Sequence, residues 1–276
     1  MNALPIYEAI QEVLRQGERV AVATVVKTSG AAPCTVGSKM VIRADGSTEG
    51  TLAGPITDQK VVQLALEAMR EERTFLQHVH LDADQGEAVG SCGATLEIFF
   101  EVLQPQPRLI IAGAGYVAQA LARQAISLGF HIVVVDDRRD LADPKNFGEQ
   151  VQLTFGDIPE TIRTLAQDTS SWIVIVTRGH HLDKDALRAA LETRASYIGM
   201  IGSPSKVKHI FKDLLNEGVS RERLAAVHAP IGLDLGAETP DEIALSIAAE
   251  MVMLRRKGTG AQLKTIHRLL EEEALV

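Results

Sequence analysis

The sequence is short of cysteine, of basic residues and of long apolar runs. Only 2 of its 276 residues are cysteine, and so few thiols favour a reducing compartment over a disulfide framework. With 28 Lys and Arg against 36 Asp and Glu, the net charge of −8 argues against a nucleic-acid-binding surface. No apolar run approaches the ~18 to 20 residues of a membrane span, and the N-terminal stretch lacks the apolar core of a signal peptide. We therefore expect a cytoplasmic protein that binds neither nucleic acid nor membrane.

The length and one proline-rich segment divide the chain. At roughly 150 residues per domain, the chain is long enough for two domains. Gln104-Pro105-Gln106-Pro107 disfavours helix and suits an extended linker. We predict an N-terminal domain at 1–103, a linker at 104–107, a second domain at 108–256 and an amphipathic C-terminal helix at 257–276.

The N-terminal domain is predicted to be α+β. Apolar residues at helical spacing precede Gly17, which suits a left-handed helix end. The β-branched runs 19–27, 39–43 and 94–103 should pair into a mostly antiparallel sheet, with a hairpin at Asp45-Gly46. A further amphipathic helix is expected around residues 61–69.

The second domain alternates strands with helices. Strands are predicted at 109–112, 131–135, 151–155, 172–176 and 197–201, and helices at 117–128, from 157, from 183, after 203–204 and at 239–254. Alternation with continuous apolar strands is typical of a parallel sheet covered on both faces. The fold class is therefore α/β: a C-terminal Rossmann-like, doubly wound parallel sheet with an N-terminal α+β domain.

A glycine-rich turn follows the first strand of the second domain. Gly113, Gly115 and Ala118 form a G-x-G-x-x-A pattern that opens a helix, and the next strand ends at Asp136. Such glycines allow close approach of a phosphate to helix amides, and the acidic residue can reach a ribose hydroxyl. The pattern predicts a site for a nucleotide or another phosphate-bearing ligand. The alternative is a turn kept only for packing.

Both cysteines lie in loops of small residues. Cys92 and Gly93 end the run Gly90-Ser91-Cys92-Gly93, and Cys34 ends Ala31-Ala32-Pro33-Cys34. A thiolate in such a loop could act as a nucleophile or a soft metal ligand. The alternative is a buried thiol that behaves as a small apolar side chain. Whether the two loops converge in space is left open.

A histidine pair follows a strand of the second domain. His180, His181 and Asp183 come at the carboxyl edge of the predicted sheet, where ligands bind. They are weak candidates for a divalent metal site or for proton transfer. The alternative is a capping loop in which Asp183 is the helix N-cap and the histidines are solvated.

A long loop precedes the last predicted helix. It carries His228, Asp234 and Glu238 among apolar residues and glycines, and ends at a capping box that begins at Thr239. Functional loops are often built in this way. A structural crossover is an equally good interpretation.

Several segments resemble one known family. GAGYVAQALARQAISLGFHIVVVDDR, SYIGMIGSPSKV and VHAPIGLDLGAETPDEIALSIAAEMV resemble the Rossmann-type half of the xanthine dehydrogenase accessory (XdhC/CoxI) family. PCTVGSKMVIRADGSTEGT and GSCGATLEIFFEVL are similar to its other domain. The resemblance implies a maturation chaperone that binds the molybdenum cofactor, a pterin with a phosphate and a dithiolene. It would deliver this cofactor to a molybdenum hydroxylase such as xanthine or carbon monoxide dehydrogenase.

The resemblance also assigns roles. Cys92 matches the family cysteine and would contact the metal or dithiolene, while the Gly113 turn would hold a phosphate. A homodimer is expected, and a cysteine desulfurase is a second partner to consider. Two segments depart from the family pattern: Ala31-Ala32-Pro33-Cys34 replaces Ser-x-Pro-Arg, and the segment from Ala53 to Asp58 replaces G-G-G-x-x-E.

Two other functions stay open. The first is an NAD(P)-dependent oxidoreductase, with Gly113, Gly115 and Asp136 on the nucleotide and His180 or Asp183 as proton carrier. The second is a structural adaptor that docks on a dehydrogenase without a ligand. Whether the protein is an enzyme is thus undecided, and a non-enzymatic accessory factor is favoured.

Overall fold

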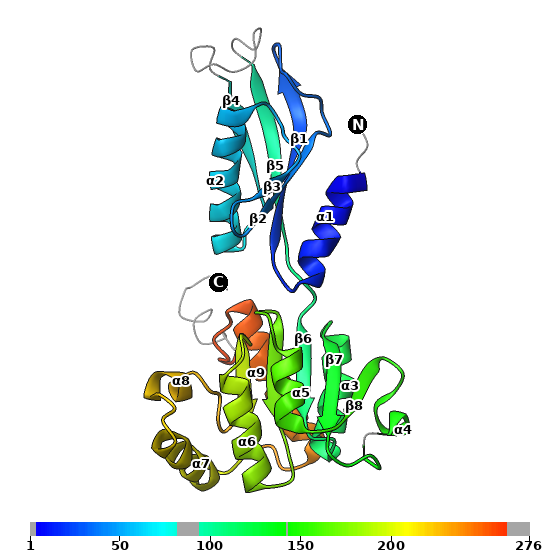
Figure 1. Ribbon diagram of the computed structural model, residues 1–276, viewed down its shortest axis with the longest axis vertical. Coiled ribbons are helices and arrows are strands. Elements are labelled where there is room, and N and C mark those ends of the chain that lie inside the picture. Colours follow the sequence, from blue (N-terminus) through cyan, green and yellow to red (C-terminus); the bar gives the residue numbers. More distant parts are fainter. Residues whose placement is uncertain (1–3, 82–93, 142, 264–276) are drawn as a thin grey trace, which may run out of the picture. The chain divides into compact units, whose positions relative to one another are not determined.

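The computed structural model describes residues 4–81, 94–141 and 143–263 (Figure 1). The chain divides into two compact units. The first contains the chain up to Pro107 and two short segments, 167–171 and 194–196, and the second contains the remainder from Arg108 onward. Within the described ranges, every helix is too short or too polar to cross a membrane.

The first unit is built on a five-stranded antiparallel sheet in the order β3-β2-β1-β5-β4. Its strands are β1 (Val20–Ser29), β2 (Lys39–Arg43), β3 (Thr48–Glu49), β4 (Phe75–His80) and β5 (Thr95–Leu103). Its helices are α1 (Leu4–Arg15) and α2 (Pro55–Glu71). Because side chains alternate along β1, Val20 packs with Val13 of α1, whereas Ala21 packs with Val61 of α2. The two helices therefore cover opposite faces of this sheet.

Two local predictions in the first unit depended on glycines with a positive φ angle. Gly17 has a φ of +75° just after α1, and Gly46 has a φ of +84° in the β2–β3 turn. These angles confirm the predicted helix end and hairpin. Strand β4 was not predicted, because its sequence FLQHVH has one buried residue, Val79.

The second unit is a parallel five-stranded sheet in the order β10-β9-β6-β7-β8. Its strands are β6 (Arg108–Ala112), β7 (His131–Asp136), β8 (Val151–Phe155), β9 (Ser171–Ile175) and β10 (Tyr197–Met200). The chain moves outward from β6 to β8 and then crosses back to β9. The strand order reverses between β6 and β9, and this is the point where open α/β sheets bind ligands. The predicted Rossmann-like fold is confirmed.

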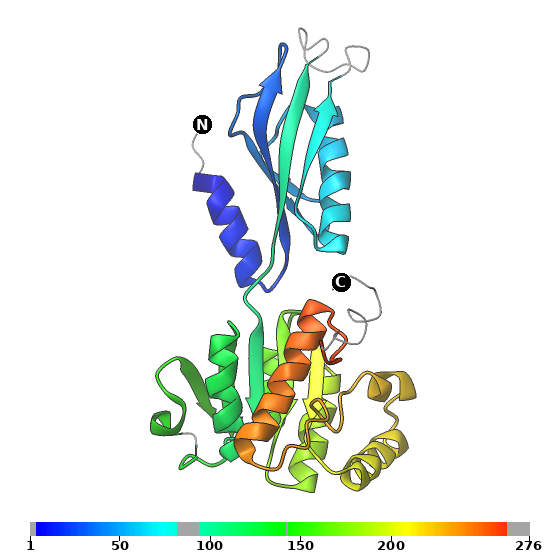
Figure 2. The same ribbon diagram turned by 180° about the vertical axis from the view of Figure 1, so that it is seen from behind.

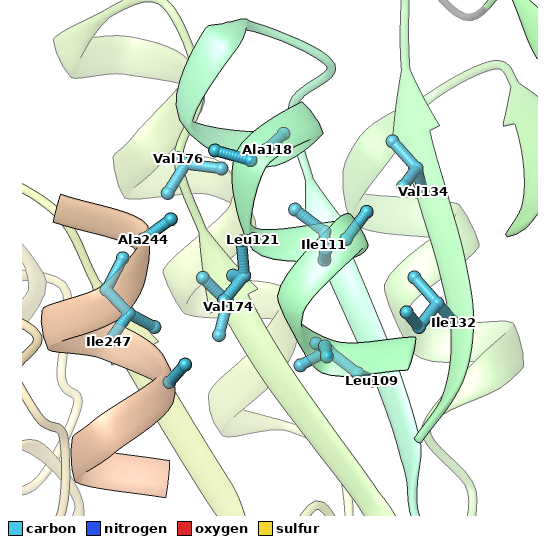
Figure 3. Close-up of a cluster of buried hydrophobic side chains, with 14 of the residues drawn as sticks. Leu109, Ile111, Ala118, Leu121, Ile132, Val134, Val174, Val176, Ala244 and Ile247 are labelled. Atoms are coloured by element: carbon cyan, nitrogen blue, oxygen red, sulfur yellow. The ribbon is translucent and has the colours of Figure 1, made fainter. Parts of the chain in front are cut away.

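Helices cover both faces of the parallel sheet. The helices of this unit are α3 (Tyr116–Ser127), α4 (Pro144–Phe147), α5 (Ile158–Leu165), α6 (His180–Leu191), α7 (Pro204–Asn216), α8 (Arg221–Ala225) and α9 (Pro240–Arg256). Figure 2 shows α3 and α9 side by side over one face, and α5 and α6 contact each other on the opposite face. Figure 3 shows the core between α3, α9 and the sheet, where Leu121 and Ile247 meet Ile111 and Val174.

The predicted start of one helix was wrong, and so was the described part of the predicted C-terminal helix. Helix α6 begins at His180 after the N-cap Gly179, three residues before the predicted start at Asp183. No side chain caps this end, so the sequence carried no capping signal there. At the other end of the chain, α9 stops at Arg256, and residues 258–263 are not helical. The rest of the predicted C-terminal helix lies outside the described residues.

Candidate functional site: the carboxyl edge of the parallel sheet

The two glycines of the G-x-G-x-x-A turn have different structural roles. Gly113 has a φ of +112°, and a Cβ atom on it would lie 2.5 Å from the carbonyl oxygen of Val176. Packing against the end of β9 therefore requires glycine at this position. A Cβ on Gly115, by contrast, would meet no atom of the described residues within 4 Å. The chain itself thus gives no steric reason for glycine at 115.

Gly115 is also the N-cap of α3, and no side chain caps it. Within the first turn, Ala118 is fully buried in the core between α3 and the sheet. The open space at Gly115 and the uncapped helix start leave room for an anion beside the first amides of α3. The turn therefore serves packing at Gly113 and Ala118, and can serve binding at Gly115.

Asp136 ends β7 and is buried beneath this turn. Oδ2 accepts hydrogen bonds from the Ala114 amide at 2.8 Å and from Nη2 of Arg138 at 3.1 Å. Oδ1 accepts from the amide and Nε of Arg138 at 2.9 and 3.0 Å. Burial favours the neutral acid, but the hydrogen bonds from Arg138 and Ala114 outweigh it and hold the pKa of Asp136 below its usual value. The carboxylate is ionised and its four acceptor positions are taken.

This arrangement limits what Asp136 can do for a ligand. A ribose hydroxyl could bind Asp136 only if Arg138 moved away, because a carboxylate offers about four acceptor positions. The neighbouring Asp137 is also engaged, since Arg178 donates to both of its oxygens at 2.7 and 2.8 Å. Two guanidinium groups therefore stand next to the turn, each neutralised by a carboxylate. Sequence reasoning missed both arginines.

The histidine pair does not form a metal site with its neighbours. Asp183 is fully buried, accepts from Oγ1 of Thr177 at 2.6 Å and forms an ion pair with Lys206. Within the described residues, no three His, Cys, Asp or Glu side chains are arranged to hold a metal ion. The metal hypothesis for His180, His181 and Asp183 is thus not supported, because a lysine ammonium stands where the cation would be. Asp183 is not the helix N-cap either.

The loop that carries His228 is anchored by a carboxylate on α9. Glu250 is buried and accepts from the Tyr197 hydroxyl at 2.6 Å and from the Gly232 amide at 3.0 Å. Nδ1 of His228 lies 3.4 Å from the same carboxylate. Burial, reinforced by Glu250, raises the pKa of Tyr197 well above its usual value. Asp234 and Glu238 are exposed. These contacts hold the loop on α9, as the crossover interpretation expects. Glu250 was missed because the buried positions around it in α9 form an apolar helix pattern.

The cysteine loops belong to the first unit. Cys92 and Gly93 lie outside the described residues. Cys34 is half-buried and packs against the core between the sheet and α2. Burial is the main cause that raises the pKa of its thiol, opposed by a backbone hydrogen bond and reinforced by Asp58. Cys34 is therefore poorly activated, as the apolar interpretation of this cysteine expects.

The residues that flank the two cysteine segments are paired with one another in the antiparallel sheet. Ser29 at the end of β1 pairs with Thr95 at the start of β5, and Thr95 also pairs with His80 at the end of β4. The Cys34 loop follows Ser29, and the segment that contains Cys92 connects His80 to Thr95. The described residues that flank the two segments therefore lie at the same end of the sheet.

Asp58 is the acidic residue of the segment that departs from the family pattern, and its contacts are within the first unit. Asp58, in the first turn of α2, accepts from the amides of Leu52 and Ala53 at 3.0 and 3.2 Å and from the Thr51 hydroxyl. These hydrogen bonds fix the loop that leads into the helix. The carboxylate of Asp58 therefore binds residues 51–53 of its own chain.

Two family descriptions match the chain. The "XdhC Rossmann domain" matches residues 109–251, and the "XdhC and CoxI family" matches residues 13–80. Together these ranges contain the parallel sheet with its glycine turn and most of the antiparallel sheet. They agree with the resemblance seen in the sequence.

Individual proteins are similar over different lengths. YqeB of Escherichia coli, described as uncharacterized, is 34% identical, and the alignment covers 87% of this chain but only 44% of YqeB. The molybdenum cofactor insertion chaperone PaoD of E. coli is 24% identical, and the alignment covers 88% of this chain and 86% of PaoD. The crystal structure of a xanthine dehydrogenase from Bacillus halodurans aligns with a TM-score of 0.50 at 19% identity, covering 94% of this chain and 98% of that one. At this identity, the last similarity establishes the fold alone.

Proposed function

Because the chain belongs to the XdhC and CoxI family, we propose that it binds the molybdenum cofactor and inserts it into a molybdenum hydroxylase. The observation that carries this proposal is the similarity to the insertion chaperone PaoD, which extends over 88% of this chain and 86% of PaoD. Similarity across both domains favours a shared role more strongly than similarity confined to a common fold. The chain then acts as a carrier, and the cofactor is its cargo.

The Gly115 end of α3 is the part of the second unit that suits the phosphate of this cargo. Among the described residues, no side chain caps α3, and no atom lies within 4 Å of a Cβ placed on Gly115. A phosphate there would accept hydrogen bonds from the first amides of the helix. Arg178, which is paired with Asp137, is a further donor for such an anion.

In the proposal, Cys92 of the first unit binds the molybdenum or its dithiolene. A thiolate is a ligand suited to a soft metal centre. The poor activation of Cys34 leaves Cys92 as the better candidate of the two thiols. A homodimer and a contact with a cysteine desulfurase are further parts of the proposal.

One observation favours the oxidoreductase as a second candidate. The strand order and the turn at Gly113 are those of dinucleotide-binding domains. Against it, the carboxylate that would hold the ribose is fully engaged by Arg138 and Ala114. Titration of the purified chain with NADH and NADPH, followed by fluorescence, distinguishes the two candidates: the chaperone proposal expects no saturable binding at micromolar concentrations.

The insertion role is tested on the hydroxylase itself. A molybdenum hydroxylase of the host is purified from cells with and without this chain, and its molybdenum content is measured by mass spectrometry. We expect enzyme made without the chain to be low in molybdenum, and expect wild-type chain but not Cys92→Ala to restore it, with Cys34→Ala as the matched control. Full molybdenum content without the chain would disprove the proposal.

A further inference from the structure

A pocket lies at the same edge of the parallel sheet, between α6 and α7. It has a volume of about 580 Å³, within the usual range for small-molecule sites. Its lining is polar, and the side chains that the argument uses are His180, His181, Lys184, Ser205, Lys206 and His209. The first three lie on the first turns of α6, and the last three on the first turns of α7. Two helix starts therefore contribute basic and hydroxyl groups to one pocket.

The ammonium of Lys206 is fixed at this pocket by a buried carboxylate. Asp183 is fully buried, and its other oxygen accepts from the Thr177 hydroxyl at 2.6 Å. A buried carboxylate requires a countercharge, which Lys206 supplies. The lysine side chain is thus held in one position instead of moving freely in solvent.

One imidazole nitrogen at the pocket lacks a hydrogen-bond partner among the described residues. Nε2 of His180 is buried and makes no hydrogen bond within the described part of the chain. The His209 ring lies 4.8 Å from the His180 ring. Buried polar atoms are normally hydrogen-bonded, and an exception at a pocket wall is explained when a bound group supplies the partner.

The charges around the pocket favour an anion. Lys184 and Arg188 share Glu217, Lys206 pairs with Asp183, and His209 lies 3.7 Å from Asp213. The two lysines and the arginine balance the three carboxylates in number. The three histidines of the lining are additional to these groups. An imidazole is the side chain that becomes cationic between about pH 8 and pH 5. A metal cation would instead face two lysine ammonium groups.

We propose that the pocket between α6 and α7 binds the phosphate group of a small phosphorylated ligand. His180, His209 and Lys184 donate to the phosphate, together with the hydroxyl of Ser205 and the fixed Lys206. The site is additional to the one at Gly115. It does not rest on the proposed function, because it is tested with inorganic phosphate and not with the molybdenum cofactor.

The test is a titration of the full chain with inorganic phosphate at pH 6.0. Heat is followed by calorimetry, and the imidazole signals by NMR. We expect saturable binding that shifts the signals of His180 and His209. His209→Gln and Lys184→Gln should each weaken binding, by about tenfold when combined. His209 is exposed, and Glu217 keeps Arg188 as its partner when Lys184 is replaced, so these variants should fold.

Controls separate this pocket from the glycine turn and from general charge effects. His131→Gln and Lys212→Gln change exposed residues of the same unit that do not line the pocket, and should bind phosphate as the wild type does. Gly115→Val should likewise leave the His180 and His209 shifts intact. The proposal is overturned if phosphate does not bind at pH 6.0, if the combined variant binds as tightly as wild type, or if Gly115→Val alone abolishes the histidine shifts.

Discussion

Arg138 binds Asp136 with its backbone amide and with its guanidinium, at distances of 2.9 to 3.1 Å. The carboxylate also accepts from the Ala114 amide in the glycine turn. The acidic residue at the end of β7 thereby connects the turn to the strand and stabilises the chain. Its position matches that of a ribose-binding carboxylate, but its hydrogen bonds are already made.

The first prediction concerns this pair and pH. Arg138→Met should lower the free energy of unfolding at pH 7 by about 1–3 kcal/mol, because hydrogen bonds to a buried charge are lost. The folded-state pKa of Asp136 is lowered, so its contribution is present above about pH 4 and is lost as the pH falls through the folded-state value. The difference between variant and wild type should therefore shrink below pH 4. Urea unfolding across pH measures it, with the exposed Arg139→Met as control, and a difference that is constant with pH would contradict the assignment.

The second prediction separates the two glycines. Gly115→Val should keep the stability of the wild type within about 1 kcal/mol and lose affinity for phosphate-bearing ligands at α3. Gly113→Val should instead fail to fold or unfold at much lower urea, since its Cβ would lie 2.5 Å from the Val176 carbonyl oxygen. Circular dichroism and calorimetric titration of phosphorylated pterin ligands test both. Equal stability of the two variants would show that the turn is packed differently.

The third prediction concerns the buried carboxylate on α9. Glu250→Gln and Tyr197→Phe should each destabilise the second unit by about 1–3 kcal/mol, because each leaves buried polar atoms without partners. The two residues share a hydrogen bond of 2.6 Å, so the double variant should lose less than the sum of the two. Urea unfolding of all four proteins gives the coupling. Simple additivity would mean that the hydroxyl and the carboxylate act independently.

The fourth prediction concerns the remaining thiol. In a Cys92→Ala variant the free cysteine is Cys34, whose pKa is raised by burial. It should react with iodoacetamide at pH 7.5 several-fold more slowly than the same protein unfolded in urea. Mass spectrometry of the alkylated fraction over time provides the rates. Reaction as fast in the folded as in the unfolded protein would show that the loop exposes Cys34.

The sequence predicted those features that repeat along the chain or need a particular residue type. The apolar strands at 109–112 and 131–135 and the glycine pattern at 113–118 were enough to place the turn at the carboxyl edge of a parallel sheet. Asp136 was located correctly for the same reason. Its saturation by Arg138 could not be foreseen, because a motif specifies residue types and not which donors fill an acceptor.

The parts that were missed depend on contacts between distant segments. Lys206 approaches Asp183 from the next helix, and Glu250 meets Tyr197 across 53 positions of sequence. Neither pairing leaves a local pattern. An acidic residue on the apolar face of a helix, as Glu250 is, was the one available signal that a buried partner exists.

The most direct test of the account is the molybdenum and pterin content of the chain purified from cells that make the cofactor. Metal is measured by mass spectrometry and pterin by fluorescence after oxidation, for the wild type, Cys92→Ala and the control Cys34→Ala. The account predicts molybdenum and pterin in equal amounts on the wild type and on Cys34→Ala, and a loss of both from a folded Cys92→Ala. Wild-type chain without molybdenum and pterin, or Cys92→Ala with the wild-type content, would contradict it.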